Sequence, residues 1–272
     1  SSKEMALQLS LPRRSTSTVI VQETAAFGRK VQRLNADIDD SSSRTISLGR
    51  MRHLWTDLLQ TVELDLDQLT SHTLITGSTG SGKSNTVYAL LDQAIQQDIP
   101  FLVIEPAKGE YKHVFGNRRD VRVLGTNDRF TELLKINPFS FPEQTHVLEH
   151  VDRLIEVFNV CWPMYAAMPA ILKDAVLRSY EACGWDLRDS TSTLNSPLFP
   201  TFADLLMQLE SVIAQSAYSD EMKSNYIGAL ATRIRSMVNG LNGQIFGADE
   251  ISNTDLFECN VIIDLSRIGS QE

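Results

Sequence analysis

Eight residues constrain the fold of this chain more than any other feature of its sequence. The spacing G-x-x-x-x-G-K-S is occupied by Gly77, Gly82, Lys83 and Ser84. Glycines allow a tight turn that brings backbone N–H groups close to an anion. The start of a following helix also favours negative charge. The apolar run TLIT precedes the turn and a helical pattern follows it, so the segment predicts a phosphate-binding loop between a strand and a helix.

Each residue type in this loop has an expected role. Lys83 is expected to reach the β- and γ-phosphates, and the Ser84 hydroxyl is expected to ligate Mg²⁺. No N-K-x-D motif for reading guanine occurs in the sequence, which favours ATP as the nucleotide, with Mg²⁺ as its metal. The expected nucleotide-binding residues run without a gap: Gly77, Ser78, Thr79, Gly80, Ser81, Gly82, Lys83, Ser84 and Asn85.

Strand-like and helix-like patterns alternate around the loop. A helical pattern covers residues 84–97. Continuous apolar runs of this kind are typical of a parallel sheet that is covered on both faces. We therefore predict an α/β fold with four buried strands, at HTLITG (72–77), PFLVIEP (100–106), VRVLG (121–125) and CNVIIDLS (259–266).

Residues 143–239 have a helical pattern instead, and they stand between two of the predicted strands. This arrangement indicates a helical insertion within the α/β domain of residues 71–272. The first 70 residues differ again, because short β-branched runs alternate with polar turns, which predicts a small β-rich module. Its strands are expected in TSTVIVQE (16–23) and RTISLGRM (44–51). The helices of the insertion are expected at 146–160, 170–183, 202–214 and 220–238.

Composition narrows the classes of partner. No run of 18 apolar residues exists, so we expect no membrane span and no membrane partner. The net charge of −9 argues against a broad basic surface, so nucleic acid would have to meet local basic stretches. The candidates are KGEYKH (108–113) and NRRDVR (117–122), and both include acids. Three scattered cysteines without C-x-x-C spacing predict free thiols and a cytoplasmic location.

Glu105 ends the second predicted strand, and α/β sheets bind ligands beyond the carboxyl ends of their strands. A carboxylate there could hold the attacking water or the Mg²⁺ shell. The alternative is an ordinary turn whose charges lie in water.

An ordered series of motifs resembles the HerA branch of the HerA/FtsK P-loop ATPases. The series is ITGSTGSGKSNT, IEPAKGEYK, INPF (136–139), RIRSMVNG and VIIDLSRIGSQE, and the resemblance covers about residues 46–272. It implies a RecA-like core with a helical insertion and a small N-terminal barrel. It also implies a homo-hexameric ring that hydrolyses ATP between subunits and translocates double-stranded DNA. The partner implied is a nuclease or an NAD-hydrolysing effector, in bacteria often within antiphage defence.

The resemblance also implies roles for single residues. Glu105 takes the place of the acid in a D-P-x-G-E-Y-like element, and Glu110 keeps the glutamate of that element. With Lys83 they are the expected catalytic residues. A ring ATPase needs a cation supplied by the neighbouring subunit. The candidates are Arg233, Arg235 and Arg267, each of which could instead be a surface or salt-bridge arginine.

The sequence departs from the family pattern at the Walker B acids. The strand NVIIDLS ends in Asp264, which could serve as the acid. In relatives, however, a DLSRIGSQE-like element precedes the Walker B strand by tens of residues. On that interpretation we expect this chain to lack the last part of the ATPase core and to bind nucleotide without turning it over alone. Both interpretations of Asp264 stay open on the sequence.

Two other functions fit the same motifs. The first is a nucleotide-dependent hexameric scaffold that assembles and regulates an effector enzyme without processive translocation, which the acidic net charge favours. The second is a type IV secretion ATPase, which shares this core and predicts partners in a membrane complex. DNA-dependent ATP hydrolysis would distinguish a translocase from a scaffold.

Overall fold

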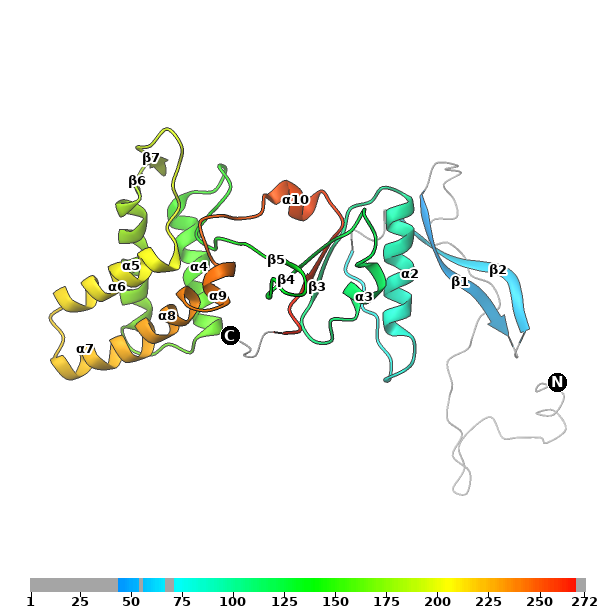
Figure 1. Ribbon diagram of the computed structural model, residues 1–272, viewed down its shortest axis with the longest axis horizontal. Coiled ribbons are helices and arrows are strands. Elements are labelled where there is room, and N and C mark those ends of the chain that lie inside the picture. Colours follow the sequence, from blue (N-terminus) through cyan, green and yellow to red (C-terminus); the bar gives the residue numbers. More distant parts are fainter. Residues whose placement is uncertain (1–43, 54–55, 67–70, 268–272) are drawn as a thin grey trace, which may run out of the picture. The chain divides into compact units, whose positions relative to one another are not determined.

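The computed structural model describes residues 44–53, 56–66 and 71–267 (Figure 1). The chain divides into two compact units, Ser1–Leu90 and Leu91–Glu272, and each is described here by itself.

The first unit contains an antiparallel hairpin, formed by β1 (Thr45–His53) and β2 (Thr56–Asp65). Register shifts interrupt the ladder near Gly49, whose φ of +129° suits glycine. The hairpin confirms the strand predicted within residues 44–51. The other predicted strand, at 16–23, lies outside the described residues, and so does most of the small β-rich module.

One predicted strand is absent from the structure. Residues 72–77 adopt no regular structure, and the side chain of Leu74 is 87% exposed. The prediction of a buried strand was wrong here. An apolar run becomes a strand only where a neighbouring strand takes up its backbone N–H and C=O groups, and no described residue pairs with this segment in a ladder. The helix after the loop is confirmed as α2 (Lys83–Gln96).

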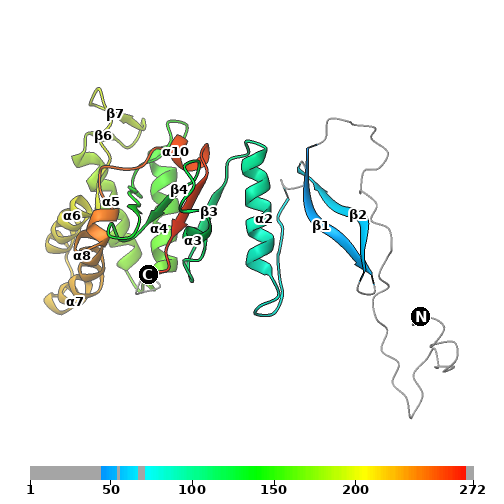
Figure 2. The ribbon, with the colours of Figure 1, turned by 45° about the vertical axis from the view of Figure 1, so that its right-hand side comes forward.

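The second unit is built on a parallel four-stranded sheet with the order β3-β8-β4-β5. The three longer strands are confirmed predictions: β3 (Leu102–Glu105), β4 (Arg122–Gly125) and β8 (Val261–Asp264). The short β5 (Glu132–Leu133) completes the edge. Figure 2 shows β8, the last strand in sequence, between β3 and β4. All four residues of its run VIID are buried, as in a parallel strand that is covered on both faces.

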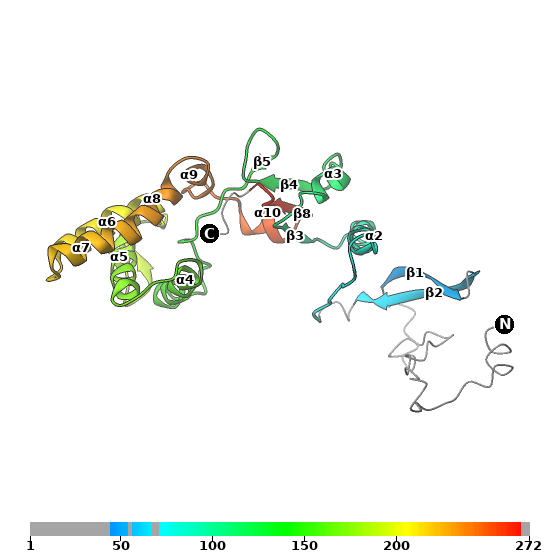
Figure 3. The ribbon, with the colours of Figure 1, turned by 90° about the horizontal axis from the view of Figure 1, so that it is seen from below.

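Between β5 and β8 the chain forms a helical cluster (Figure 3). All four predicted helices are present, although the last one is interrupted by a π-helical turn, η2 (Ile227–Ala231). The short elements of this stretch are β6 (Trp185–Asp186), β7 (Thr191–Ser192), α9 (Asn242–Ile245) and α10 (Asn253–Phe257). The short helix α3 (Tyr111–Phe115) lies earlier in the chain, between β3 and β4. The helices of the cluster are α4 (Val147–Cys161), α5 (Met168–Ala182), α6 (Phe202–Gln215), α7 (Asp220–Tyr226) and α8 (Thr232–Val238).

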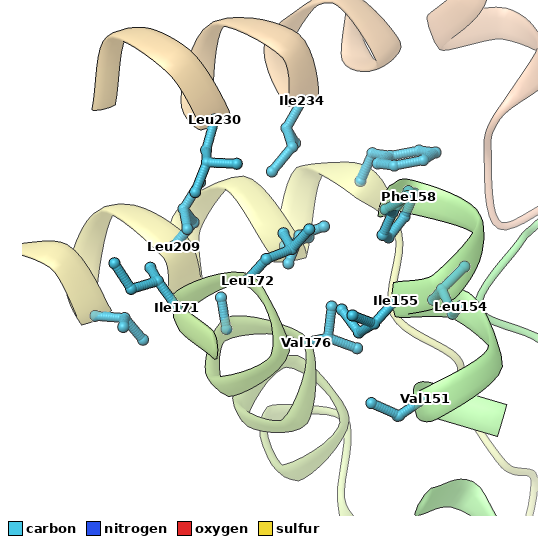
Figure 4. Packing of buried hydrophobic residues seen from close by; sticks show 14 of the residues in the cluster. Val151, Leu154, Ile155, Phe158, Ile171, Leu172, Val176, Leu209, Leu230 and Ile234 are labelled. Carbon is cyan, nitrogen blue, oxygen red and sulfur yellow. The ribbon is translucent and has the colours of Figure 1, made fainter. Parts of the chain in front are cut away.

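The cluster has one continuous hydrophobic core (Figure 4). Leu172, Leu209 and Leu230 come from three different elements, and none of them is accessible to solvent. On α4, the buried Val151, Leu154, Ile155 and Phe158 follow the period of an amphipathic helix that buries a single face. The extent of the insertion and the domain boundary at residue 70 stay predictions.

The INPF segment joins the sheet to the helical cluster. Ile136 forms a parallel bridge with Phe246, and three residues later Phe139 is fully buried among the helices. The buried Asn137 side chain donates to the carbonyl of Pro200 at 3.0 Å and accepts from the backbone N–H of Phe139 at 3.1 Å. Because the buried Asn137 amide both donates and accepts a hydrogen bond, it fixes the direction of the chain where it leaves the sheet. The INPF motif therefore sets how the chain enters the helical cluster.

Two expectations from composition can be compared with the described residues. Cys161, Cys183 and Cys259 are free thiols, as predicted. No helix within the described ranges is both long enough and apolar enough to cross a bilayer.

Candidate nucleotide-binding and catalytic site

The phosphate loop owes its shape to its glycines. Gly80 and Gly82 have φ values of +79° and +93°, in the left-handed region that side chains with a Cβ rarely adopt. A Cβ on either would meet no atom within 4 Å, so backbone conformation and not space requires glycine at both positions. At Gly77 the reason is different, because a Cβ there would lie 2.4 Å from Ser81 Oγ. The turn is therefore tight at its start and left-handed in its middle.

The Lys83 ammonium folds back over this loop. Its Nζ donates to the carbonyl oxygens of Gly77 at 2.8 Å and Ser78 at 2.9 Å. The side chain thus stands at the loop, next to the first turn of α2, where unpaired N–H groups favour an anion. A phosphate oxygen carries more negative charge than a carbonyl and would be the stronger acceptor for this cation. The loop residues therefore fit a nucleotide phosphate, with the half-buried Ser84 beside Lys83 in the first turn to supply a hydroxyl for Mg²⁺.

Glu105 is buried in the second unit, and both of its carboxylate oxygens accept hydrogen bonds from the backbone. Oε1 accepts from the N–H of Glu110 at 2.7 Å, and Oε2 accepts from the N–H of Tyr111 at 3.1 Å. The side chain is only 6% exposed, so the alternative of a charge lying in water does not describe it. Each carboxylate oxygen has a second lone pair, so Glu105 can still accept from a water molecule. Burial, Glu105 and Glu110 together raise the pKa of the Tyr111 hydroxyl.

Glu110 presents its carboxylate at the surface. It lies 3.4 Å from the Lys108 ammonium, and both side chains are largely exposed. An exposed pair of this kind contributes about 0–1 kcal/mol. Glu110 therefore supports Glu105 by donating its backbone N–H to the Glu105 carboxylate, while its own carboxylate stays available for other contacts.

Asp264 ends β8 directly opposite Glu105 in the sheet register. It is 3% exposed and accepts from Lys112 Nζ at 2.6 Å. The backbone N–H and the hydroxyl of Ser266 donate to its other oxygen at 3.0 and 2.6 Å. Burial raises the pKa of the Asp264 carboxyl, but these hydrogen bonds and the Lys112 charge outweigh burial and leave that pKa below its ordinary value. Asp264 is thus an ionised acid with a cation already attached.

Gly109 allows the loop after β3 to approach this acid closely. Its φ is +66°, and a Cβ there would lie 2.6 Å from Ser266 Oγ and 3.3 Å from Asp264 Oδ1. Sequence reasoning missed the Lys112–Asp264 pair, because the two residues stand 152 positions apart. The available signal was a lysine at the end of KGEYK and an acid at the end of an apolar strand, both expected at the same edge of a sheet.

The candidate arginines lie in three different environments. Arg235 pairs with Glu210 at 3.0 Å, whereas Arg233 donates to the carbonyl of Pro163 at 3.4 Å. They contact different elements, as their spacing of two on a helix predicted. The guanidinium of Arg267 lies 3.7 Å from the centroid of the Phe130 ring.

The basic stretch NRRDVR is largely neutralised within the second unit. Arg118 pairs with Asp92 at 2.9 Å and with Asp120 at 2.8 Å, and Arg122 pairs with Glu132. These contacts hold the pKa of the Asp120 and Glu132 carboxyls below the ordinary value, chiefly through the arginine hydrogen bonds. This stretch therefore offers little unpaired positive charge to a nucleic-acid backbone.

Comparison with known proteins identifies the family. The sequence model described as "Helicase HerA, central domain" matches residues 46–272, most of the chain. Among solved structures, the chain is similar to VirB4 of Thermoanaerobacter pseudethanolicus, with a TM-score of 0.56 and 20% sequence identity. The match covers 86% of this chain and 60% of that one, so the chain spans less than two thirds of the VirB4 structure. No curated protein matches the chain significantly.

Proposed function

Because the chain belongs to the family of the HerA helicase central domain and has a RecA-like P-loop ATPase fold, we propose that it binds ATP and Mg²⁺ on residues 77–85 and drives hydrolysis in a homo-oligomeric ring. The observation that carries this proposal is the phosphate loop. Its left-handed glycines and the Lys83 ammonium stand directly before α2. This arrangement of backbone, cation and helix start is suited to a phosphate chain.

We assign the chemistry to three side chains. Lys83 holds the β- and γ-phosphates, and Ser84 contributes a hydroxyl to Mg²⁺, which neutralises charge on the phosphates. Glu105 orients the attacking water through the lone pairs that the backbone of residues 110 and 111 leaves free. Glu110 supports Glu105 through its N–H and remains a second candidate catalytic acid.

The ring itself is part of the proposal. A cation supplied across a subunit interface would neutralise developing charge on the γ-phosphate. Arg233 and Arg267 are the candidates, because Arg235 is engaged by Glu210 within its own subunit. The ring would be hexameric and cytoplasmic, and it would translocate double-stranded DNA together with a nuclease or an NAD-hydrolysing effector, plausibly in antiphage defence.

ATP hydrolysis by the full-length protein tests this proposal directly. The rate would be measured with and without linear duplex DNA, beside Lys83→Ala and the control Lys173→Ala, which removes an exposed lysine paired with Asp152 on another helix. We expect DNA to stimulate hydrolysis, Lys83→Ala to abolish it and the control to leave it unchanged. Hydrolysis that survives Lys83→Ala would overturn the proposed nucleotide site.

A regulatory scaffold is the second candidate function. The observation that favours it is the pairing of Arg118 and Arg122 with acids, which removes one candidate surface for DNA. If the protein is a scaffold, the rate of ATP hydrolysis should not change when DNA is added. A stable complex with an effector should form only when nucleotide is present. The similarity to VirB4 keeps a secretion ATPase as a third candidate, which predicts binding to a membrane complex.

A further inference from the structure

A cavity of about 730 Å³ opens beside the sheet of the second unit, apart in sequence from the phosphate loop. Its walls come from α3, from the start of β4, from residues 130–132 and from the turn after β8. None of the residues 77–85 lines it. The volume lies within the range of small-molecule sites, about 300–1,000 Å³. Two segments singled out in the sequence, KGEYKH and the residues after VIIDLS, meet in its wall.

The cavity is positively charged in an acidic protein. Lys108, Lys112 and Arg267 line it, and the acid in the lining is Glu132. Lys112 is paired with Asp264 and Glu132 with Arg122, so Lys108 and Arg267 remain and give the wall a charge of +2, whereas the whole chain has a net charge of −9. A local positive field of this kind attracts anions, phosphates in particular.

The three cations differ in how firmly they are held. Lys112 is bound to the buried Asp264, which neutralises its charge. Lys108 makes only an exposed contact of 3.4 Å with Glu110, which is weak enough for the ammonium to turn towards a phosphate. His113 and Thr131 stand in the same wall and can donate hydrogen bonds, whereas the Ser266 hydroxyl already donates to Asp264.

An aromatic ring lies on the same wall. Phe130 is 57% exposed, and the Arg267 guanidinium lies over its ring, 3.7 Å from the centroid. A large exposed aromatic side chain in a polar, cationic cavity is not explained by the core, because it buries little area. Nucleic-acid sites combine these two features, since cations hold the phosphates and aromatic and guanidinium planes stack on the bases.

We propose that this cavity binds a nucleotide unit, with its phosphate held by Lys108 and Arg267 and its base stacked on the Phe130–Arg267 pair. The unit can be a free nucleotide or one residue of a single DNA strand. A duplex does not qualify, because its bases are stacked on one another and paired. The proposed site consists of residues of the second unit alone, and the Lys83→Ala background of its test keeps it distinct from nucleotide binding on residues 77–85. The readout of that test is binding and not hydrolysis, so a role of Arg267 in hydrolysis across a subunit interface does not decide it.

Fluorescence anisotropy with a labelled single-stranded decanucleotide tests the site. The measurements use the Lys83→Ala protein, so that the phosphate loop does not contribute to nucleotide binding. We expect saturable binding that Phe130→Ala weakens about tenfold, as for the loss of one base stack. We expect Arg267→Gln to weaken binding as well and to lower the slope of log K against log salt by about 0.7, as for one phosphate contact on a single strand.

The matched control is Phe257→Ala, which removes an equally exposed phenylalanine that does not line the cavity. It should leave the affinity unchanged. Competition by unlabelled mononucleotide at millimolar concentration would identify a free nucleotide as the natural ligand. Competition by the oligonucleotide alone would identify a strand. Failure of the Lys83→Ala protein to bind either ligand, or equal effects of Phe130→Ala and Phe257→Ala on single-strand binding, would overturn the proposal. Duplex binding that Phe130→Ala weakens as much as single-strand binding would overturn it as well, whereas duplex binding that Phe130→Ala leaves unchanged belongs to the proposed translocation.

Discussion

Breaking the Lys112–Asp264 ion pair should destabilise the sheet at its central strand. The change to make is Lys112→Ala. Removing one partner of a buried ion pair costs about 3–5 kcal/mol, because the other charge is left without compensation. Here the cost should be smaller, about 2 kcal/mol, because the Lys112 side chain keeps 17% exposure and Ser266 still donates to Asp264.

The destabilisation should also depend on pH. The Asp264 pKa is lowered in the folded chain, so the stability that it contributes is present above its ordinary value of 3.8 and is lost as the pH falls below that value. Removing Lys112 takes away two of the causes that lower the Asp264 pKa, so that pKa should be higher in the variant than in the parent chain. The deficit of Lys112→Ala should therefore be largest near neutral pH and should shrink as the pH falls through the range in which Asp264 of the variant takes up its proton.

Urea unfolding followed by far-UV circular dichroism gives the free energy, and hydrogen exchange of the Val261–Asp264 amides reports the strand itself. The control is Lys173→Ala, which removes an exposed pair and should cost less than about 1 kcal/mol. The double variant Lys112→Ala/Asp264→Asn should lose less than the sum of its single variants. Strict additivity, or a cost for Lys112→Ala no larger than that of the control, would refute the reasoning.

Three further outcomes are expected. Gly80→Ala should weaken ATP binding, measured by calorimetry, because its φ of +79° costs an alanine about 1–2 kcal/mol, whereas Gly228→Ala, at a helical position, should not. Tyr180→Phe should lower the unfolding free energy by about 1–3 kcal/mol, because the Phe139 carbonyl loses its buried donor; unchanged denaturant midpoints would contradict this. Burial chiefly, together with the Arg153 charge, lowers the pKa of His150, although the hydrogen bond to the Pro138 carbonyl acts in the opposite direction. The stability that neutral His150 contributes is therefore complete above about pH 6.5, its ordinary pKa, and is lost as the pH falls from there through the folded-state pKa. The melting temperature should accordingly drop between pH 7 and pH 5, and His150→Gln should reduce that drop.

The strands and helices that follow from local pattern were predicted well. The buried runs at 102–105, 122–125 and 261–264 and the four long amphipathic segments each contain their own signal, because burial on one or both faces dictates their period. The run at 72–77 shows the limit of that signal. Its residues are apolar enough for a strand, but a strand also needs a neighbour, and pairing is not a local property.

The same limit applies to the site. The glycines and Lys83 of the phosphate loop are adjacent in sequence, so their spacing alone predicts their geometry. The contacts of Asp264 with Lys112 and of Arg267 with Phe130 join residues far apart in the chain, and neither partner could be chosen from the sequence. Only the sheet order, with β8 between β3 and β4, brings the ends of these segments together.

Two acids that look alike in sequence differ in the partners that the fold gives them. Glu105 and Asp264 both end apolar strands, lie opposite each other and are buried. Asp264 is paired with the Lys112 ammonium and with Ser266, so it holds α3 and the turn after β8. Among the described residues, the hydrogen bonds to Glu105 come from two backbone amides, which leave lone pairs of its carboxylate oxygens unused. A carboxylate without a paired cation, such as Glu105, can orient a water molecule or a water in the coordination shell of a metal ion. A carboxylate in an ion pair, such as Asp264, must first lose its cation. The difference in partners therefore supports assigning the water-orienting role to Glu105 and a structural role to Asp264.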